Sequence, residues 1–333
     1  MNLPNILRPK NKKLKDRYIL CLDGGGMRGI IPVVILKKFY SMLSGKEEKT
    51  NYPITSYFDL ISGTSTGGLI ATALTCGTGM KQSQTGHGDQ TDLQGLIDIY
   101  KADGKTIFPQ ELFTNLLNPI SDKYPVQPIE NLLKTWFEDT PFHEAKIPTL
   151  VMSYNASLGL PFEMTSTENK ELLAWEVARS TSAAPTYFSP YKIGKNLLID
   201  GGVIANNPSL YAYKYAKRLY PECQNFHILS LSTCTIPYTF KKKSSYGLSS
   251  WLSVHKIYST SQMQTVEEII TCFEDCDYLR IDKPLSKSIP MDNSQHHNMI
   301  MLEKHGEKLY NNSEEKLKTY CNGLIKNRKI KER

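Results

Sequence analysis

The hydrophobic and polar positions of the N-terminal part follow a strand–turn–helix pattern that occurs twice. In residues 18–44 the apolar run YILCLD is followed by DGGGMRG and then by IIPVVILKKFYSML. A short apolar run bounded by glycines is typical of a buried strand, and the longer apolar segment predicts a packed helix. Residues 58–75 repeat the order around GTSTGG, with a strand before it and a helix after it.

The middle of the chain changes from helical to strand-like patterning. Residues 76–95 are polar and glycine-rich, and predict a mobile loop. Apolar residues at helical spacing predict helices within 96–140, in LIDIY, ELFTNLL and IENLLKTWF. Apolar runs at 147–156 and 160–166 predict strands, and residues 171–184 predict a helix that ends before a proline.

The remaining pattern alternates strands and helices. A hairpin turning at Gly194 is expected in 191–202, and a helix in 205–220 with Asn207 as N-cap and Pro208 in its first turn. The later expected elements are a strand at 226–232, a long helix near 249–273, a strand at 278–281 and C-terminal helices. Alternating strands and helices predict a layered α/β fold with a mainly parallel sheet.

Composition limits the class of protein. The chain has 333 residues, 40% of them hydrophobic, which suits one large α/β domain or two small ones, and no linker or repeat divides it. No apolar stretch has the length of a secretory signal or of a membrane span. The seven cysteines are scattered, and Cys272 and Cys276 lack a second pair of zinc ligands. We therefore expect reduced thiols, a cytoplasmic location, and no metal or other cofactor.

The net charge of +7 is concentrated at the two ends. Residues 8–17 carry six Lys or Arg and one acid, and residues 326–333 carry five and one, so the rest of the chain is slightly acidic. A body without excess positive charge argues against nucleic acid as a partner. The expected organisation is a basic extension over 1–17, one catalytic domain over 18–325 and a basic tail over 326–333. Such ends are either solvated or attracted to an anionic membrane or a phosphate-bearing partner.

The GTSTGG segment contains GxSxG around Ser65. Between a strand and a helix, this pattern indicates a nucleophile elbow, in which a strained turn presents the serine beside the helix N-terminus. The alternative is a glycine-rich turn whose serine caps the helix.

A nucleophilic serine needs a base, and the seven histidines are poor candidates. None lies in a glycine-marked turn at the end of a strand; they are residues 87, 143, 227, 255, 296, 297 and 305. Asp200 does lie there, between LLI and Gly201-Gly202. A carboxylate is a weak base at its usual pKa of about 3.9, but apolar surroundings raise that value. Its alternative role is a local hydrogen bond in a turn.

The glycines of DGGGMRG expose several amides toward one point before a helix, which suits a phosphate or a developing oxyanion. Their spacing also fits GxGxxG, but no acidic residue ends a second strand about 20 residues later, since Asp59 comes too late. Arg28 adds a positive charge that either orients this loop, assists anion binding or forms a surface salt bridge.

Four segments together resemble the signature blocks of the patatin-like phospholipases. DGGGMRG, GTSTGG and DGGVIANNP occur in the family's order, and ARSTSAAPTYFSP (178–190) resembles its block ending in AAPxYF. The likeness runs from about Tyr18 to about Ser232. After the late strand the chain reads LSTCT, where many members have a glycine-rich turn, and this leaves the local pocket undefined.

The resemblance implies a three-layer α/β/α sandwich and a Ser–Asp dyad that uses no catalytic histidine. Ser65 matches the nucleophile and Asp200 its partner. The oxyanion loop matches Gly24, Gly25 and Gly26, with Arg28 as the arginine of that block. The implied activity is a phospholipase A type acyl hydrolysis of membrane glycerophospholipids through an acyl-enzyme, with peripheral membrane contact.

Three other functions stay open. Some bacterial members are antiviral defence effectors switched on by a nucleotide second messenger, and such a protein would bind a small nucleotide activator and could form oligomers. A general Ser-His-Asp esterase and a binding module built on the glycine loops are the others. Residues 241–258, which begin with three consecutive lysines and contain Trp251, Leu252 and Tyr258, predict either a membrane-interface segment or a core helix.

Overall fold

The computed structural model describes residues 15–46, 52–77, 93–107, 122–234, 254–287 and 289–331. The expected loop at 76–95 and the expected helix at 111–117 lie largely or wholly outside these ranges, as do Trp251 and Leu252. None of the helices within the described ranges combines the length and the hydropathy required to cross a bilayer.

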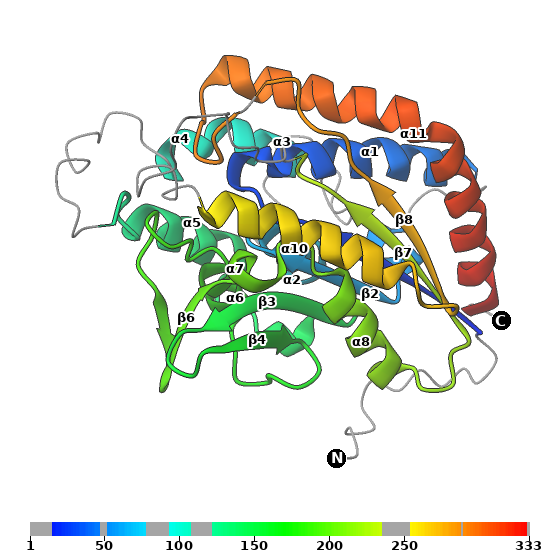
Figure 1. The fold of residues 1–333 in the computed structure, drawn as a ribbon, viewed down its shortest axis with the longest axis horizontal. Coiled ribbons are helices and arrows are strands. Elements are labelled where there is room, and N and C mark those ends of the chain that lie inside the picture. The colour runs from blue at the N-terminus through cyan, green and yellow to red at the C-terminus, as the bar shows by residue number, and fades with distance from the viewer. Residues whose placement is uncertain are drawn as a thin grey trace, which may run out of the picture.

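An eight-stranded sheet forms the centre of the molecule (Figure 1). Its order is β5-β6-β3-β2-β1-β7-β8, with β4 paired to β3. Five strands, β3, β2, β1, β7 and β8, run parallel to one another. The other three, β4, β5 and β6, join the sheet through antiparallel pairs. The strands are β1 (Asp16–Leu22), β2 (Leu60–Thr64), β3 (Thr149–Asn155), β4 (Leu160–Thr165), β5 (Tyr191–Ile193), β6 (Asn196–Asp200), β7 (Asn225–Leu231) and β8 (Cys276–Ile281).

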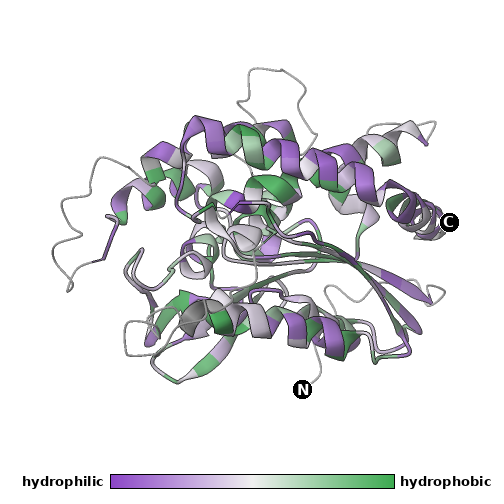
Figure 2. Cartoon of the chain, turned by 45° about the horizontal axis from the view of Figure 1, so that its top comes forward, coloured by the Kyte–Doolittle hydropathy of each residue, from purple (hydrophilic) through white to green (hydrophobic). Residues whose placement is uncertain are grey.

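Helices cover both faces of this sheet, and a hydrophobic core fills each of the two gaps. The alternation along β1 shows why: Leu20 and Leu22 enter one core, and Ile19 and Cys21 enter the other. The first core is covered by α1 (Ile30–Gly45), α2 (Thr66–Cys76), α3 (Leu93–Ala102), α5 (Gln127–Phe137), α6 (Ala174–Thr181) and α11 (His296–Lys331). The second is covered by α7 (Gly202–Ala205), α8 (Ser209–Leu219) and α10 (Val254–Ile270). The helices carry both hydrophilic and hydrophobic residues, as expected when one face packs on the sheet (Figure 2).

The expected three-layer, mainly parallel architecture is confirmed, and several elements differ in detail. The helix expected over 171–184 is shorter, because Leu173 precedes it in extended backbone and α6 ends at Thr181. The helix expected over 205–220 begins at Ser209, although the side chain of Asn207 still accepts the amide hydrogen of Ser209 at 3.0 Å. The expected C-terminal helices form one helix, α11. A short helix, α4 (Gly104–Ile107), follows α3.

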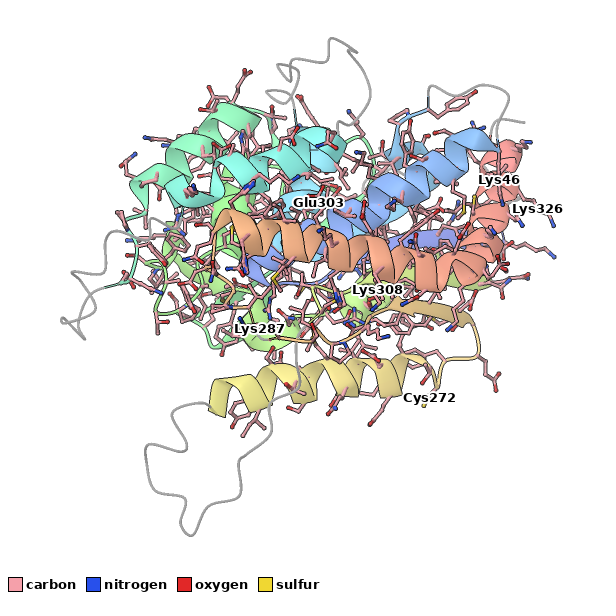
Figure 3. All side chains as sticks on the ribbon, turned by 90° about the horizontal axis from the view of Figure 1, so that it is seen from above. Lys46, Cys272, Lys287, Glu303, Lys308 and Lys326 are labelled. Carbon is pink, nitrogen blue, oxygen red and sulfur yellow. The ribbon has the colours of Figure 1, made fainter. Side chains whose placement is uncertain are left out.

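One basic residue near each end of the chain is buried in the described structure. Arg17 lies in β1, and its guanidinium makes a buried ion pair of 3.1 Å with Asp59. At the other end α11 continues to Lys331, and Arg328 is buried over the ring of Tyr52 at 3.8 Å. Lys326, in the same last turns, projects at the end of the molecule where Lys46 closes α1 (Figure 3). Arg17 and Arg328 are thus packed against the rest of the chain, whereas Lys326 is exposed.

Candidate active site

Ser65 and Asp200 meet at the carboxyl-terminal edge of the parallel sheet. The Ser65 hydroxyl donates a hydrogen bond of 2.6 Å to Oδ2 of Asp200. Ser65 follows β2, and Asp200 ends β6, which runs antiparallel to β3 with Ser153 opposite Asp200. The sheet register thus brings together two residues that the sequence predicted as nucleophile and base.

The turn at Ser65 is strained, as an elbow requires. Ser65 has φ 54° and ψ −124°, a conformation that costs a non-glycine residue about 1–3 kcal/mol. The helix after it passes so close to β1 that a Cβ on Gly67 would collide with the backbone of Leu22. Thr181 holds the turn from the other side: its Oγ1 accepts the Ser65 amide hydrogen at 2.8 Å and donates to the Met152 carbonyl at 2.6 Å.

Asp200 is buried, and only 5% of its surface is exposed. Burial raises the pKa of this carboxyl from 3.8 to about 6, against the smaller lowering effects of its hydrogen bonds with Ser65 and with the Gly202 amide. Two hydrogen bonds thus fix the carboxylate, and its raised pKa makes it a better proton acceptor than an exposed aspartate.

The glycine loop between β1 and α1 lies directly against the nucleophile. A Cβ added to Gly24 would be 3.1 Å from the Cβ of Ser65. The Gly24 amide donates to the Asn206 carbonyl at 3.0 Å, and the Asp23 carboxylate before it holds the buried Arg280 guanidinium by two hydrogen bonds, at 2.8 and 2.5 Å. These contacts anchor the first residues of the loop. The Gly24 amide already donates to Asn206, so it is not free to bind another acceptor.

The next two amides have a different environment. Within the described residues, the amides of Gly25 and Gly26 donate no hydrogen bond, and both glycines line pockets that contain Ser65. Gly26 has φ +59°, which allows the chain to turn here into α1.

Bonds to the preceding carbonyls set the direction of these amides. The Gly24 carbonyl accepts from Thr233 Oγ1 at 2.6 Å and from Asn206 Nδ2 at 3.3 Å, and the Gly25 carbonyl accepts from Arg28 Nε at 3.2 Å. In a planar trans peptide the C=O and the following N–H point in opposite directions. The amides of Gly25 and Gly26 therefore point away from Thr233 and Arg28 respectively.

The sequence leaves three roles open for Arg28: loop orientation, anion binding or a surface salt bridge. Among the described residues no carboxylate pairs with it, and burial lowers the pKa of its guanidinium. It orients the loop through the Gly25 carbonyl and also lines the open cleft over Asp200.

Two pockets meet at Ser65. One is an open cleft of about 640 Å³ lined by Arg28, Asp200, Asn206 and Tyr258. The other is a narrow pocket of about 70 Å³, and its lining is almost entirely apolar. Ser65, Ala184, Tyr187 and Met291 border both pockets.

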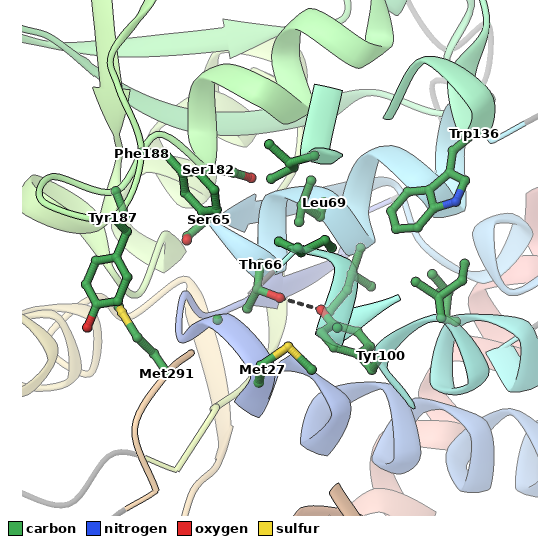
Figure 4. Close-up of a pocket in the computed structure, with 18 residues that line it drawn as sticks. Met27, Ser65, Thr66, Leu69, Tyr100, Trp136, Ser182, Tyr187, Phe188 and Met291 are labelled. Carbon is green, nitrogen blue, oxygen red and sulfur yellow. Dashed lines mark hydrogen bonds between the residues drawn. The ribbon is translucent and has the colours of Figure 1, made fainter. Parts of the chain in front are cut away.

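The apolar pocket extends from the nucleophile along α2. In Figure 4, Ser65 and Tyr187 lie at one end, Leu69 lies between, and Trp136 lies at the far end. A polar pair interrupts its wall where the hydroxyls of Thr66 and Tyr100 share a hydrogen bond.

Neither a histidine nor a metal-binding group contributes to this site within the described ranges. No histidine lines either pocket; His227, for instance, contacts Asp16 and Asp277 at the opposite edge of the sheet. A search of the described residues finds no group of three or more His, Cys, Asp or Glu side chains placed to hold a metal ion.

Sequence reasoning missed three residues of the site: Thr181, Asn206 and Thr233. Thr181 and Asn206 stand inside the segments ARSTSAAPTYFSP and DGGVIANNP, which resemble family blocks, but nothing in those segments predicts the contacts of the two side chains. Thr233 lies in LSTCT, where the chain departs from the expected glycine-rich turn, and that departure was the available signal.

Comparison with known proteins finds one matching family model and several related sequences. The family model described as patatin-like phospholipase matches residues 20–213. "Probable inactive patatin-3-Kuras 1" of Solanum tuberosum is 28% identical, covering 89% of this chain and 86% of that protein. A "cGAMP-activated phospholipase" of Vibrio cholerae is 27% identical, covering 74% of this chain and 72% of that protein. Among solved structures, VipD from Legionella pneumophila matches with a TM-score of 0.40 and 12% identity, over 90% of this chain and 67% of that one.

Proposed function

The chain belongs to the patatin-like phospholipase family, and we propose that it hydrolyses acyl esters of membrane glycerophospholipids with Ser65 as nucleophile and Asp200 as base. The observation that carries this proposal is the 2.6 Å hydrogen bond between the two side chains in a strained elbow beside free loop amides. One relative bears the name of an inactive protein, so family membership alone does not establish turnover.

In the first step Ser65 Oγ attacks the ester carbonyl carbon while its proton passes to Asp200 Oδ2. The negative charge that develops on the carbonyl oxygen is stabilised by the amides of Gly25 and Gly26 and by the N-terminus of α2. The ester C–O bond then breaks, and Asp200 returns the proton to the leaving glycerol oxygen. The products are a lysophospholipid and an acyl group bound to Ser65.

In the second step water attacks the acyl-enzyme, with Asp200 again accepting the proton. The bond to Ser65 Oγ breaks, the serine recovers its proton, and a fatty acid leaves. Since two hydrogen bonds hold Asp200 in place and burial raises its pKa to about 6, it serves both as base and as acid near neutral pH.

The two pockets suggest how the substrate is divided. The apolar pocket behind Ser65 suits the acyl chain, whereas the open cleft suits the glycerophosphate part. Arg28 has no carboxylate partner among the described residues and borders this cleft, so its guanidinium is suited to a phosphate oxygen. Gly24 serves in this scheme as a spacer against Ser65, and Gly25 and Gly26 serve as donors.

The test is fatty-acid release from vesicles of defined phospholipids by the purified protein and by Ser65→Ala. We expect release by the wild type and a loss on the order of 10³-fold or more in the variant. Equal release by both proteins would refute the proposal. The reaction needs no Lewis acid in this scheme, so hydrolysis of a soluble ester should persist in the presence of a chelator.

A second candidate is a phospholipase that a nucleotide second messenger switches on, as in a defence effector. It is favoured by the similarity to the Vibrio cholerae protein, whose name describes activation by cGAMP. Addition of cGAMP to the purified chain should then raise fatty-acid release from a low basal level. A rate that cGAMP leaves unchanged would favour an enzyme that works without this activator.

A further inference from the structure

Three leucines are exposed at the edge of the sheet that carries the catalytic centre. Leu158, in the turn between β3 and β4, is 66% exposed, Leu160, the first residue of β4, is 57% exposed, and Leu197 at the start of β6 is 38% exposed. Exposed large apolar side chains gathered in one region often mark an interaction surface.

The turn presents these leucines in a defined conformation. The side-chain oxygen of Asn155 accepts the Ser157 amide hydrogen at 3.0 Å. The backbone carbonyl of Asn155 accepts the amide hydrogens of Leu158 and Gly159 at 3.2 and 2.9 Å. Gly159 has φ +69°, which closes the turn between the two leucines. Leu197 is joined to the same turn, since its amide donates to Ser157 Oγ at 3.1 Å.

The register places this turn on the same side as the dyad. β3 runs parallel to β2, so its last residue lies at the edge where β2 delivers Ser65. Asp200 is opposite Ser153, and the strand continues two residues further to Asn155, roughly 7 Å outward. The turn therefore projects beyond the catalytic centre on its open side, where β6 is labelled in Figure 1.

The charge of this region favours an anionic partner. The two segments that build it, residues 156–162 and 191–199, contain no Asp or Glu. Lys192 and Lys195, in and beside the hairpin between β5 and β6, are both exposed. Nearer the dyad, the cleft itself is bordered by Val203 and Tyr258, which are 41% and 62% exposed.

We propose that this hairpin surface, defined as Leu158, Leu160 and Leu197 with Lys192 and Lys195, docks the protein on an anionic lipid bilayer. The leucines enter the interface between headgroups and acyl chains, while the lysines contact anionic headgroups. This orientation turns the mouth of the cleft toward the lipid, so that an acyl chain reaches Ser65 without crossing water. The inference rests on the proposed lipid substrate.

Vesicle binding in the Ser65→Ala background tests the surface without hydrolysis. Flotation with phosphatidylcholine–phosphatidylglycerol vesicles should show a loss on the order of tenfold or more for Leu158→Ser/Leu160→Ser, because two exposed apolar side chains are removed. Ile269→Ser is the matched control. Ile269 is 43% exposed but lies roughly 17 Å from Tyr258 along α10, toward the opposite edge, so this change should leave binding unaltered.

Variants of the two lysines provide a second test of the surface. Lys192→Gln/Lys195→Gln should weaken binding to the anionic vesicles and leave binding to pure phosphatidylcholine unchanged, and added salt should mask the difference. With Ser65 intact, hydrolysis of a short soluble ester should be the same in all these variants, which shows that the site still folds.

Two results would overturn the docking surface: wild-type vesicle binding by the double leucine variant, or loss of a dimer in that variant with vesicle binding unchanged. The second result would assign the leucines to contact with another copy of the chain. Failure of the proposed function looks different, because the Ser65→Ala protein would still bind vesicles through these residues while the wild type released no fatty acid.

Discussion

Ser65 Oγ donates a hydrogen bond of 2.6 Å to Asp200 Oδ2, although 135 positions separate the two residues. This contact depends on the sheet register, because β2 and β6 both pair with β3 and end at neighbouring positions, Thr64 opposite Met152 and Asp200 opposite Ser153. No histidine lines the pockets formed by the described residues, and the hydroxyl of Ser65 donates its hydrogen bond to Asp200.

The pH dependence of hydrolysis should follow Asp200. Burial raises the pKa of this carboxyl to about 6, and only its ionised form accepts the serine proton. With a soluble ester, kcat/KM should therefore fall about tenfold per pH unit below pH 6 and become constant above about pH 7. Circular dichroism at each pH separates titration from unfolding, and a rate that stays constant down to pH 5 would exclude Asp200 as the base.

Asp200→Asn should inactivate the protein and stabilise its fold. The folded state keeps the Asp200 proton up to pH about 6, whereas the unfolded state releases it near 3.8, so the wild type loses stability as pH rises through this window. The shift of roughly two pKa units corresponds to about 3 kcal/mol. Urea unfolding at pH 8 should show the variant more stable by up to this amount, and the difference should vanish near pH 4. A variant less stable than wild type at pH 8 would contradict the assigned cost of burying this charge.

Thr233→Val should slow catalysis without loss of the fold. Its hydroxyl holds the Gly24 carbonyl at 2.6 Å and so directs the Gly25 amide toward the site. Removing an oxyanion donor lowers kcat about 10²–10³-fold. In Thr233→Val the Gly25 amide remains but its direction is no longer fixed, so kcat should fall less, roughly tenfold to a hundredfold, with little change in KM. Thr233→Ser keeps the hydroxyl and is the control. The assigned role fails if valine and serine variants turn over a soluble ester equally well.

The sequence predicted the dyad because both residues stand in glycine-marked turns, and a turn of that kind is a local feature. It did not predict which loop amides are free. Gly24 to Gly26 look alike in sequence, and only the partners Asn206, Thr233 and Arg28, from distant or adjacent positions, distinguish the occupied amide from the two others.

The same limit applied to the chain ends. A run of lysines and arginines indicates a solvated tail, yet burial depends on what the fold places beside each residue. Arg17 meets Asp59 and Arg328 meets Tyr52, and neither partner is near in sequence. The burial of these two arginines could therefore not be predicted from the runs of charge in which they stand.

The most direct test of the central claim is to locate the acyl group during turnover. Wild-type protein mixed with a slowly deacylating activated ester, quenched in acid and digested, should carry one added acyl mass on the peptide that contains Ser65, and on no other. Asp200→Ala should form this adduct at least about 10³-fold more slowly. An acyl group on a different residue, or adduct formation at the wild-type rate in Asp200→Ala, would contradict the account.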